Sequence, residues 1–275
     1  MIDKNEITAR AKAEGLRFDQ IEKDHVILWI LHALSQSELK PKGWIFKGGT
    51  CLRQCYYSGY RFSEDPDFSC REDSGGAEEA LRFLRESTQW VQANALLRVS
   101  LKEAQASEGD FQVEIPVEYS RGGPRQRGLP AIKIHLTFDE PILTQPESRP
   151  VRPPYSDLSP FTMMAYSKEE ILAEKTRGLL QQQSKWPRPR DLYDLWFILC
   201  HKNERYPWEP LLSLFAEKCR ARKIEPDTKL LVSPTLKSTN ERVWESQLQM
   251  LMREVPPFEE VWRDWSDFCK QRFTG

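Results

Sequence analysis

The spacing of apolar residues in the first half of the chain alternates between helical and strand-like. Apolar positions three or four residues apart predict helices at residues 3–15, 17–36 and 76–97. Short apolar or alternating segments predict strands at residues 44–46, 98–102, 112–119 and 131–138. A hairpin turn at residues 107–110 joins two of these strands, and Pro116 predicts that its strand lies at a sheet edge.

The second half of the chain is helical after a proline-rich crossing. Residues 140–160 predict extended chain or a meandering edge, because proline cannot continue a helix. One more short strand is expected at residues 161–166, and helical spacing then recurs at residues 168–183, 192–201, 208–221, 241–253 and 258–273. We therefore predict an α+β core with a mixed sheet over residues 1–166 and a helical domain over residues 167–275.

Two polar motifs flank the helix that we predict at residues 51–57. Gly48-Gly49-Thr50 comes directly after the first strand, where glycine lets backbone approach a phosphate closely and a helix N-terminus offers free N–H groups. Asp65 and Asp67 follow on a polar strand and project to one face, because side chains alternate along a strand. Adjacent carboxylates repel unless a cation lies between them, and hard oxygen ligands favour Mg²⁺. Each motif alone is most often an ordinary turn or a solvated edge, but together they predict phosphoryl or nucleotidyl transfer.

The run FKGGTCLRQCY…YRFSEDPDF resembles the first motif of the AbiEii/AbiGii family of nucleotidyltransferase toxins, relatives of the MenT toxins. The usual family form is Gly-Gly-Thr/Ser followed by Arg-Phe-Ser-x-Asp-Leu-Asp-Phe. Pro66 replaces the usual apolar residue between the aspartates. Because proline lacks a backbone N–H, we expect this strand to lie at an edge or to be just beginning at Pro66. The resemblance implies a polymerase-β-like nucleotidyltransferase fold.

A second motif lies in the helical half, in the run YSKEEILAEKTRGLL…RPRDLYDLWFIL. It resembles the family pattern Glu-x-x-x-x-Lys on one helix and Arg-Asp-x-x-Asp-Leu at the start of the next. The residues that carry it here are Glu170, Lys175, Arg190, Asp191 and Asp194. The resemblance implies that the helical domain completes the active-site cleft.

The resemblance also implies a role for each residue of this second motif. Lys175 would contact the triphosphate, Asp191 would act as general base or orient Lys175, and Arg190 would contact the nucleotide. Structural alternatives are an exposed charge for Lys175 and a helix cap for Asp191. Asp194 is interpreted as a salt-bridge partner of Arg190 one helical turn away.

Two further sets of residues are interpreted as structural. Many nucleotidyltransferases place a third carboxylate on the polar face of the strand at residues 131–138, and the matching position is His135. Imidazole suits Mg²⁺ poorly, so His135 is assigned a sheet-surface or pocket-lining role. Glu22-Lys23-Asp24 is interpreted as part of a packing helix, although the family often has the same triplet. The basic loop at residues 121–128 and the cluster Lys218, Arg220, Arg222 and Lys223 are interpreted as solvated, with RNA contact as the alternative.

Composition excludes several classes of protein. The chain has 275 residues with 39% hydrophobic and 29% charged residues, as in ordinary globular proteins. The net charge of −1 argues against broad coating of nucleic acid. The longest apolar run, residues 26–34, is too short to cross a bilayer, and no signal-peptide core is seen, so a cytoplasmic protein without a membrane partner is expected. Six scattered cysteines show no CxxC spacing, so we expect neither a disulfide framework nor a zinc site.

Taken with the resemblance, these observations predict a nucleotidyltransferase toxin of a toxin–antitoxin system. Asp65 and Asp67 would hold Mg²⁺, and Gly48, Gly49 and Thr50 would contact the phosphates of an NTP. The resemblance implies transfer of a nucleoside monophosphate to RNA, with the acceptor end of tRNA as one candidate, and a cognate antitoxin as partner. The alternatives are transfer to a protein or small molecule, or a degenerate member that binds nucleotide without catalysis.

Overall fold

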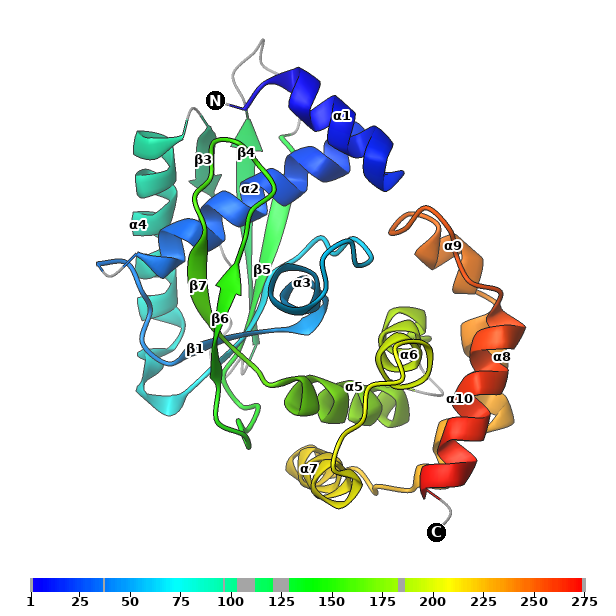
Figure 1. Ribbon diagram of the computed structural model, residues 1–275. Coiled ribbons are helices and arrows are strands. Elements are labelled where there is room, and N and C mark those ends of the chain that lie inside the picture. The colour runs from blue at the N-terminus through cyan, green and yellow to red at the C-terminus, as the bar shows by residue number, and fades with distance from the viewer. Residues whose placement is uncertain are drawn as a thin grey trace. The chain divides into compact units, whose positions relative to one another are not determined.

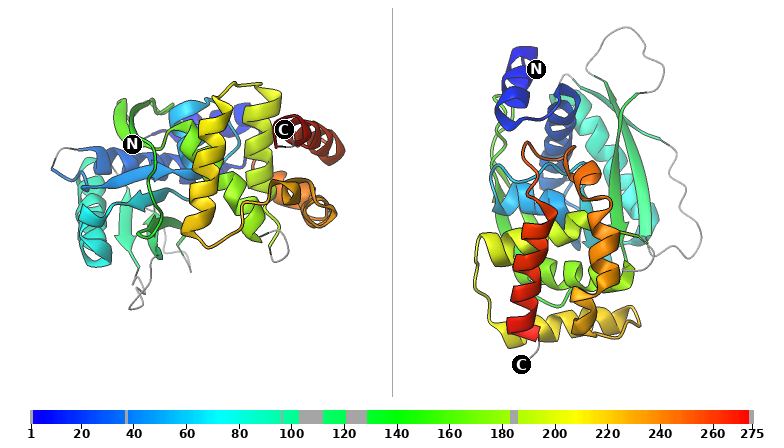
Figure 2. Two further views of the ribbon diagram at one scale, coloured as in Figure 1. Left: turned by 90° about the horizontal axis from the view of Figure 1, so that it is seen from below. Right: turned by 90° about the vertical axis from the view of Figure 1, so that its right-hand side faces the viewer.

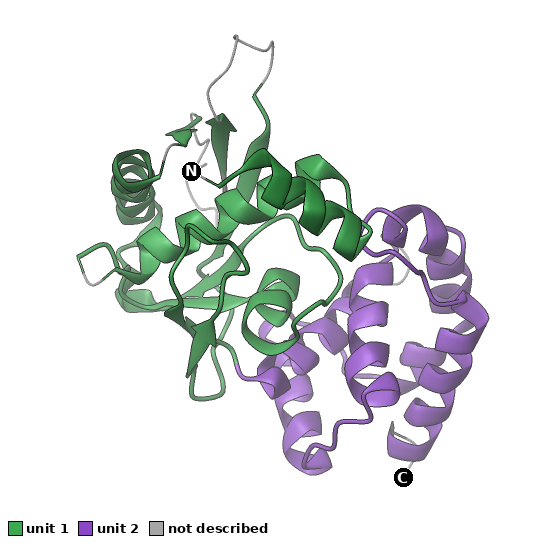
Figure 3. Ribbon diagram, turned by 45° about the horizontal axis from the view of Figure 1, so that its top comes forward, with its two compact units in different colours: residues 1–166 green, residues 167–275 purple. Residues whose placement is uncertain are grey.

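The computed structural model describes residues 2–36, 38–95, 97–102, 112–120, 129–182 and 186–273. The expected hairpin turn at 107–110 and the basic loop at 121–128 lie outside these residues. The chain divides into two compact units, Met1–Tyr166 and Ser167–Gly275, which are coloured separately in Figure 3. None of the described helices is both long and apolar enough to cross a membrane.

The first unit is built on a seven-stranded mixed sheet with the strand order β3-β4-β5-β2-β1-β7-β6 (Figure 1). The strands are β1 (Trp44–Lys47), β2 (Asp67–Cys70), β3 (Arg98–Leu101), β4 (Gln112–Ser120), β5 (Ala131–Thr137), β6 (Glu147–Val151) and β7 (Phe161–Ala165). The β1–β7 and β2–β5 pairs are parallel, and the other pairs are antiparallel. The centre of the sheet therefore joins β2, which carries the aspartate motif, to β5, which carries His135.

Helix α2 (Phe18–Ser35) forms the centre of the apolar core of this unit. Its apolar residues after the exposed Phe18 are buried around the whole circumference, as expected for a helix that neighbours enclose. Helices α1 (Lys4–Glu14) and α4 (Gly76–Asn94) pack against α2, while α4 also contacts β3 and α2 contacts β7 (Figures 1 and 2). Isoleucine and leucine at alternate positions of β5 are fully buried, which confirms the predicted alternation of that strand.

The second unit is a group of helices without strands among its described residues (Figure 2). Its α-helices are α5 (Lys168–Gln182), α6 (Pro189–Trp196), α7 (Trp208–Ala221), α8 (Pro234–Glu241), α9 (Trp244–Leu248) and α10 (Phe258–Phe273). A π-helical turn, Phe197–His201, continues α6, and a 3-10 helix, Thr228–Val232, precedes α8. Val261 and Trp265 of α10 are fully buried, so the aromatic stripe of this helix belongs to the core.

Several boundaries differ from the sequence-based prediction. The stretch 140–160 contains β6, whose backbone pairs with β7 despite its proline residues. Residues 241–253 do not form one helix, since α8 ends at Glu241 and only the short α9 follows. The Gly48-Gly49-Thr50 segment is not a separate turn but the first part of helix α3 (Gly48–Cys51), which continues as the π-helical turn η1 (Leu52–Tyr56).

Of the two proline-based predictions, the one for Pro66 is confirmed in its second alternative, and the edge position predicted for the strand of Pro116 is wrong. Strand β2 lies between β5 and β1, but it begins only at Asp67, so Pro66 precedes the antiparallel ladder, as the second alternative predicted. Strand β4 lies between β3 and β5, and the carbonyl of Pro116 accepts a hydrogen bond from the Lys102 N–H at 3.0 Å. Because the N and O of one residue face the same neighbour in an antiparallel strand, the missing N–H of Pro116 faces the end of β3.

Candidate active site

The glycine motif and the aspartate motif lie against each other in the first unit. Gly48 has φ +76°, a left-handed conformation that favours glycine, and a Cβ atom there would lie 2.4 Å from Asp67 Oδ2. A Cβ atom on Gly49 would lie 2.8 Å from a guanidinium nitrogen of Arg61. Gly48 therefore lets the start of α3 lie directly against the Asp67 carboxylate, and Gly49 leaves room for Arg61.

Thr50 holds the backbone of the aspartate motif. Its hydroxyl is fully buried and donates a hydrogen bond to the Asp65 carbonyl at 2.7 Å, and it lies 2.9 Å from the Ser63 hydroxyl. The sequence-based prediction had this hydroxyl as a further donor to phosphate. In the structure its proton is directed to the Asp65 carbonyl, so the hydroxyl connects the start of α3 to the backbone of the aspartate motif.

Each carboxylate of the aspartate pair has its own partner within the first unit. Asp65 Oδ1 lies 3.5 Å from Lys23 Nζ and accepts the Lys133 N–H at 3.3 Å. Asp67 Oδ1 lies 3.1 Å from His135 Nδ1, and the register of β2 and β5 places these two residues directly opposite each other. Repulsion between the carboxylates is therefore balanced by the protein itself and does not by itself require a metal ion.

The donor set nevertheless fits Mg²⁺. Asp65 and Asp67 provide carboxylate oxygens, and Mg²⁺ in enzymes is commonly bound by one or two carboxylates with water and substrate phosphates as its remaining ligands. Within the part of the chain that the structure describes, no group of three or more His, Cys, Asp or Glu residues has the geometry of a metal site. The chain thus offers a two-carboxylate site rather than a full protein cage.

The second unit contains a buried cluster of one lysine and two aspartates. Lys175 of α5 places Nζ 2.6 Å from Asp191 Oδ1 and 2.8 Å from Asp194 Oδ2, both on α6. The side chains of Lys175 and Asp191 are 10% and 14% exposed, and that of Asp194 is 0% exposed. Gly178, one turn after Lys175, also lies beside Asp191, since a Cβ there would be 3.4 Å from Asp191 Oδ2, an ordinary van der Waals contact.

The Asp191 carboxyl is strongly held in its ionised form. Burial alone would raise its pKa, but the charges of Lys175 and Arg188 outweigh burial and lower the pKa to about 2. Arg188 Nη1 lies 3.1 Å from Asp191 Oδ2. Helix α6 begins at Pro189, so Asp191 lies inside the first turn and is not a helix cap, which was the structural alternative for this residue.

Three further sequence-based interpretations are corrected. Asp194 pairs with Lys175 and not with Arg190, whose side chain is exposed. Lys218 is fully buried, with Nζ 2.7 Å from the equally buried Glu170, and it does not belong to a solvated basic cluster. Lys23, which was interpreted only as part of a packing helix, also contacts Asp65. The polar triplet that interrupts the apolar face of α2 was the sequence signal that could have indicated this contact.

Comparison with known proteins decides the family. A model of the family described as nucleotidyl transferase AbiEii toxin, type IV toxin–antitoxin system, matches residues 29–267, most of the chain. The chain belongs to the AbiEii family of nucleotidyltransferase toxins. A search of curated proteins finds no match.

Solved structures share the AbiEii-family fold. MenT4, the nucleotidyltransferase toxin Rv2826c from Mycobacterium tuberculosis H37Rv, superposes with a TM-score of 0.67 at 20% sequence identity. This match covers 98% of the present chain and 90% of MenT4. JHP933 from Helicobacter pylori superposes with a TM-score of 0.60 at 18% identity and covers 94% of each chain. At these identities the likeness concerns the fold, while the family match establishes a nucleotidyltransferase.

The AbiEii match spans both groups of candidate residues. The first group, on α3 and β2, contains Gly48, Gly49, Thr50, Asp65 and Asp67. The second group, on α5 and α6, consists of Lys175, Asp191 and Asp194 with the neighbouring Arg190. Each group is assembled within its own unit by the contacts described above.

Proposed function

We propose that this AbiEii-family protein transfers a nucleoside monophosphate from an NTP to a hydroxyl of an RNA acceptor, with the 3′ end of tRNA as the leading candidate. The observation that carries this proposal is the contact between the Gly48 turn and the Asp67 carboxylate, with Asp65 two residues before it. Such an arrangement combines close backbone approach to phosphate with a pair of acidic ligands. The acceptor hydroxyl would attack the α-phosphorus while pyrophosphate leaves.

The first unit would bind and orient the triphosphate. Mg²⁺ held by Asp65 and Asp67 supplies positive charge to the phosphate oxygens when it is bound. The backbone at Gly48 and Gly49 would approach the phosphates, and no side chain caps the first turn of α3. Thr50 would keep the Asp65 backbone fixed, and Lys23 would restrain the Asp65 carboxylate in the absence of nucleotide.

Lys175 and Asp191 would act in the same reaction. A lysine ammonium stabilises the negative charge that develops on phosphate oxygens during transfer. A general base works best with a pKa near the operating pH, and the Asp191 pKa of about 2 is far below neutrality. We therefore assign Asp191 to orienting Lys175 rather than to accepting the acceptor proton, while the exposed Arg190 would contact the nucleotide.

The direct test follows labelled NMP from each of the four NTPs into total RNA, protein and small-molecule fractions of a lysate, with and without Mg²⁺. We expect Mg²⁺-dependent label in RNA, lost at least about a hundredfold in Asp65→Asn and Lys175→Ala. Asp73→Asn serves as the matched control, because its side chain is 52% exposed and its ion pair among the described residues is with exposed Lys42. Label in protein or in a small molecule alone would support the other acceptor classes. The absence of turnover with every NTP would support a degenerate member, which the imidazole of His135 opposite Asp67 favours.

The same proposal predicts a biological outcome. Expression of the wild type in a bacterial cytoplasm should arrest growth, and the Asp65→Asn variant should not. Co-expression of a cognate antitoxin should restore growth. Growth arrest by both the wild type and Asp65→Asn would show that toxicity does not depend on nucleotidyl transfer.

A further inference from the structure

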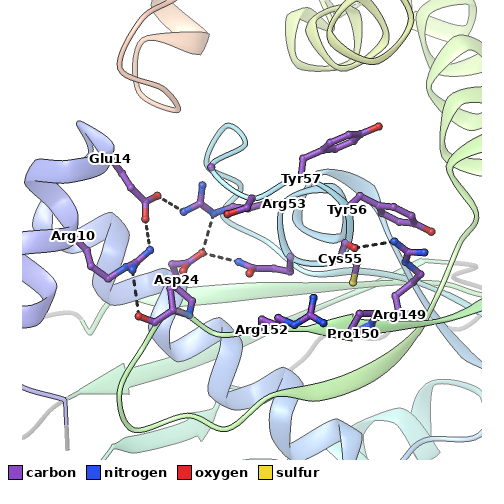
Figure 4. A pocket seen from close by; sticks show the side chains of 14 residues that line it. Arg10, Glu14, Asp24, Arg53, Cys55, Tyr56, Tyr57, Arg149, Pro150 and Arg152 are labelled. Carbon is purple, nitrogen blue, oxygen red and sulfur yellow. Dashed lines mark hydrogen bonds and ion pairs between the residues drawn. The ribbon is translucent and has the colours of Figure 1, made fainter. Parts of the chain in front are cut away.

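A polar pocket of about 380 Å³ lies in the first unit, separate from the aspartate pair (Figure 4). It is lined by α1, α2, the end of η1 and the chain around the end of β6. Four of its lining residues are arginines, namely Arg10, Arg53, Arg149 and Arg152. Its volume lies within the range of small-ligand sites, which begins at about 300 Å³.

One wall of the pocket is a closed network of ion pairs. Arg53 binds Glu14 at 2.5 Å and Asp24 at 3.3 Å, and Arg10 binds Glu14 at 2.6 Å. Asp24 also accepts hydrogen bonds from Gln54 at 2.9 Å and from the Tyr155 hydroxyl at 2.7 Å. Both acidic groups of the pocket are therefore engaged with two of its arginines, as Figure 4 shows on the side of α1.

The other side of the pocket carries positive charge next to aromatic rings. The guanidinium of Arg149 lies 4.4 Å from the centre of the Tyr56 ring, and its buried Nε has no hydrogen-bond partner in the described part of the chain. Arg152 is exposed and, among the described residues, within ion-pair distance of no carboxylate. Figure 4 shows Arg152 between the ion-pair network and Arg149, with Tyr57 beyond Tyr56. Among the described residues, Glu147 also pairs with Arg149, with 3.5 Å between Oε2 and Nη1, so three carboxylates stand against four arginines and one positive charge remains in excess.

This combination fits a particular chemical class of ligand. A guanidinium binds phosphate oxygens through paired N–H groups, and tyrosine and arginine planes stack on nucleobases. The Tyr57 ring is half-buried beside Tyr56, with ring centres 6.5 Å apart. Single-stranded nucleic acid is bound by such alternation of cations and aromatic rings, whereas an acidic peptide has no need of stacking surfaces.

We propose that this pocket binds one nucleotide of a single-stranded RNA, with the phosphate on Arg149 and Arg152 and the base against Tyr57. The RNA identity rests on the proposed function. The pocket lies at the opposite end of the α3–η1 helix from Gly48, at a distance on the order of 10 Å along that helix. A strand anchored here would extend along the first unit in a protein whose net charge of −1 gives little general attraction to RNA.

The test measures binding of a short fluorescein-labelled single-stranded oligoribonucleotide by fluorescence anisotropy, without NTP. Arg152→Gln should weaken binding about fivefold to tenfold and reduce the slope of log affinity against log salt by about 0.7, the value for one phosphate contact on a single strand. Tyr57→Ala should weaken binding about tenfold, as expected for loss of one stacked base. The matched control is Arg98→Gln, an exposed arginine on β3 at the opposite edge of the sheet from β6, which should bind as the wild type does.

Several outcomes would overturn the proposal. Equal effects of Arg152→Gln and Arg98→Gln would show that the pocket is not the RNA site. If micromolar ATP or GTP displaces the RNA from the wild type but not from Arg152→Gln, the pocket is assigned to a free nucleotide. Unchanged RNA binding with loss of antitoxin binding in Arg152→Gln would assign it to an acidic protein segment.

The proposed function can fail independently of this inference. Asp65→Asn should retain RNA binding while losing transfer. If the wild type transfers no NMP but Arg152→Gln still weakens RNA binding, the pocket assignment stands and the catalytic proposal falls. If the wild type transfers NMP and Arg152→Gln binds RNA as tightly as the wild type, the catalytic proposal stands and the pocket assignment falls.

Discussion

Replacement of Lys175 by methionine tests whether the buried cluster of the helical unit is held together by this lysine. The substitution keeps a long side chain but removes the charge that lies 2.6 Å from Asp191 and 2.8 Å from Asp194. Asp191 retains Arg188 as a partner, whereas Asp194 is 0% exposed and has lost the cation next to it. Removal of the cation that faces this fully buried carboxylate should therefore dominate the effect.

The magnitude follows from the structure. The fall of the Asp191 pKa from 3.8 to about 2 corresponds to about 2 kcal/mol in favour of the ionised form, at about 1.4 kcal/mol per pH unit. Loss of one partner of a buried ion pair typically costs about 3–5 kcal/mol. We expect Lys175→Met to lower the free energy of unfolding by this amount. Adding Asp194→Asn should restore about 1–3 kcal/mol, because the buried charge disappears with its partner.

The assay is urea denaturation followed by tryptophan fluorescence and circular dichroism, with one free energy fitted for each cooperative transition. Lys168→Met is the matched control on the same helix, since Lys168 pairs with Glu204 and both side chains are more than a quarter exposed. That surface pair should contribute less than about 1 kcal/mol. Equal destabilisation by Lys168→Met and Lys175→Met, or no recovery in the double variant, would refute the reasoning.

Three further predictions concern the two sites. Gly48→Ala should lower the free energy of unfolding by more than about 2 kcal/mol in thermal denaturation, because its Cβ would lie 2.4 Å from Asp67 Oδ2. Gly59 also has a positive φ but no atom within 4 Å of an added Cβ, so Gly59→Ala should cost about 1 kcal/mol. Equal losses in the two variants would contradict this. The folded state lowers the pKa of Asp191 from 3.8 to about 2, so this carboxylate adds stability above pH 3.8 that is lost as the pH falls towards 2. In acid titrations the Asp191 carboxylate should account for a loss of about 2 kcal/mol in wild type over that window, and Asp191→Asn should lack this contribution. His135→Asp should tighten Mg²⁺ binding about tenfold in calorimetry by supplying an oxygen ligand, and unchanged affinity would show that this position does not reach the metal.

The sequence alone was sufficient to predict the elements with strong periodicity. Helices α1, α2, α5, α7 and α10 and strands β1, β3, β5 and β7 lie within about three residues of their predicted ranges, because the spacing of their apolar residues indicates the element type. Strand β6 lies at the sheet edge, as one alternative for residues 140–160 predicted, but its bounds were not predicted because its pairing with β7 depends on tertiary context and prolines hide its pattern.

The site residues were predictable as residue types but not as contacts. The motif spacing indicated Asp65 and Asp67, and comparison with other nucleotidyltransferases indicated His135 as the matching position of a third carboxylate. Only the structure shows that His135 lies opposite Asp67. No local pattern could show that Asp194 binds Lys175 or that Lys218 is buried against Glu170, because these pairs join side chains of different helices. Charged residues were therefore assigned to solvent where the fold encloses them.

Helix α2 has a consequence for the dynamics of the first unit. Neighbouring residues of this helix, Lys23 and Asp24, contact different regions, since Lys23 lies beside Asp65 and Asp24 belongs to the ion-pair wall of the pocket. The helix around them is buried on all sides, so its amide hydrogens should exchange with solvent only when the whole unit opens. The Lys23–Asp65 contact and the ion-pair wall of the pocket are thus attached to the same rigid helix, and a ligand at either of them cannot loosen this helix without also disrupting the other.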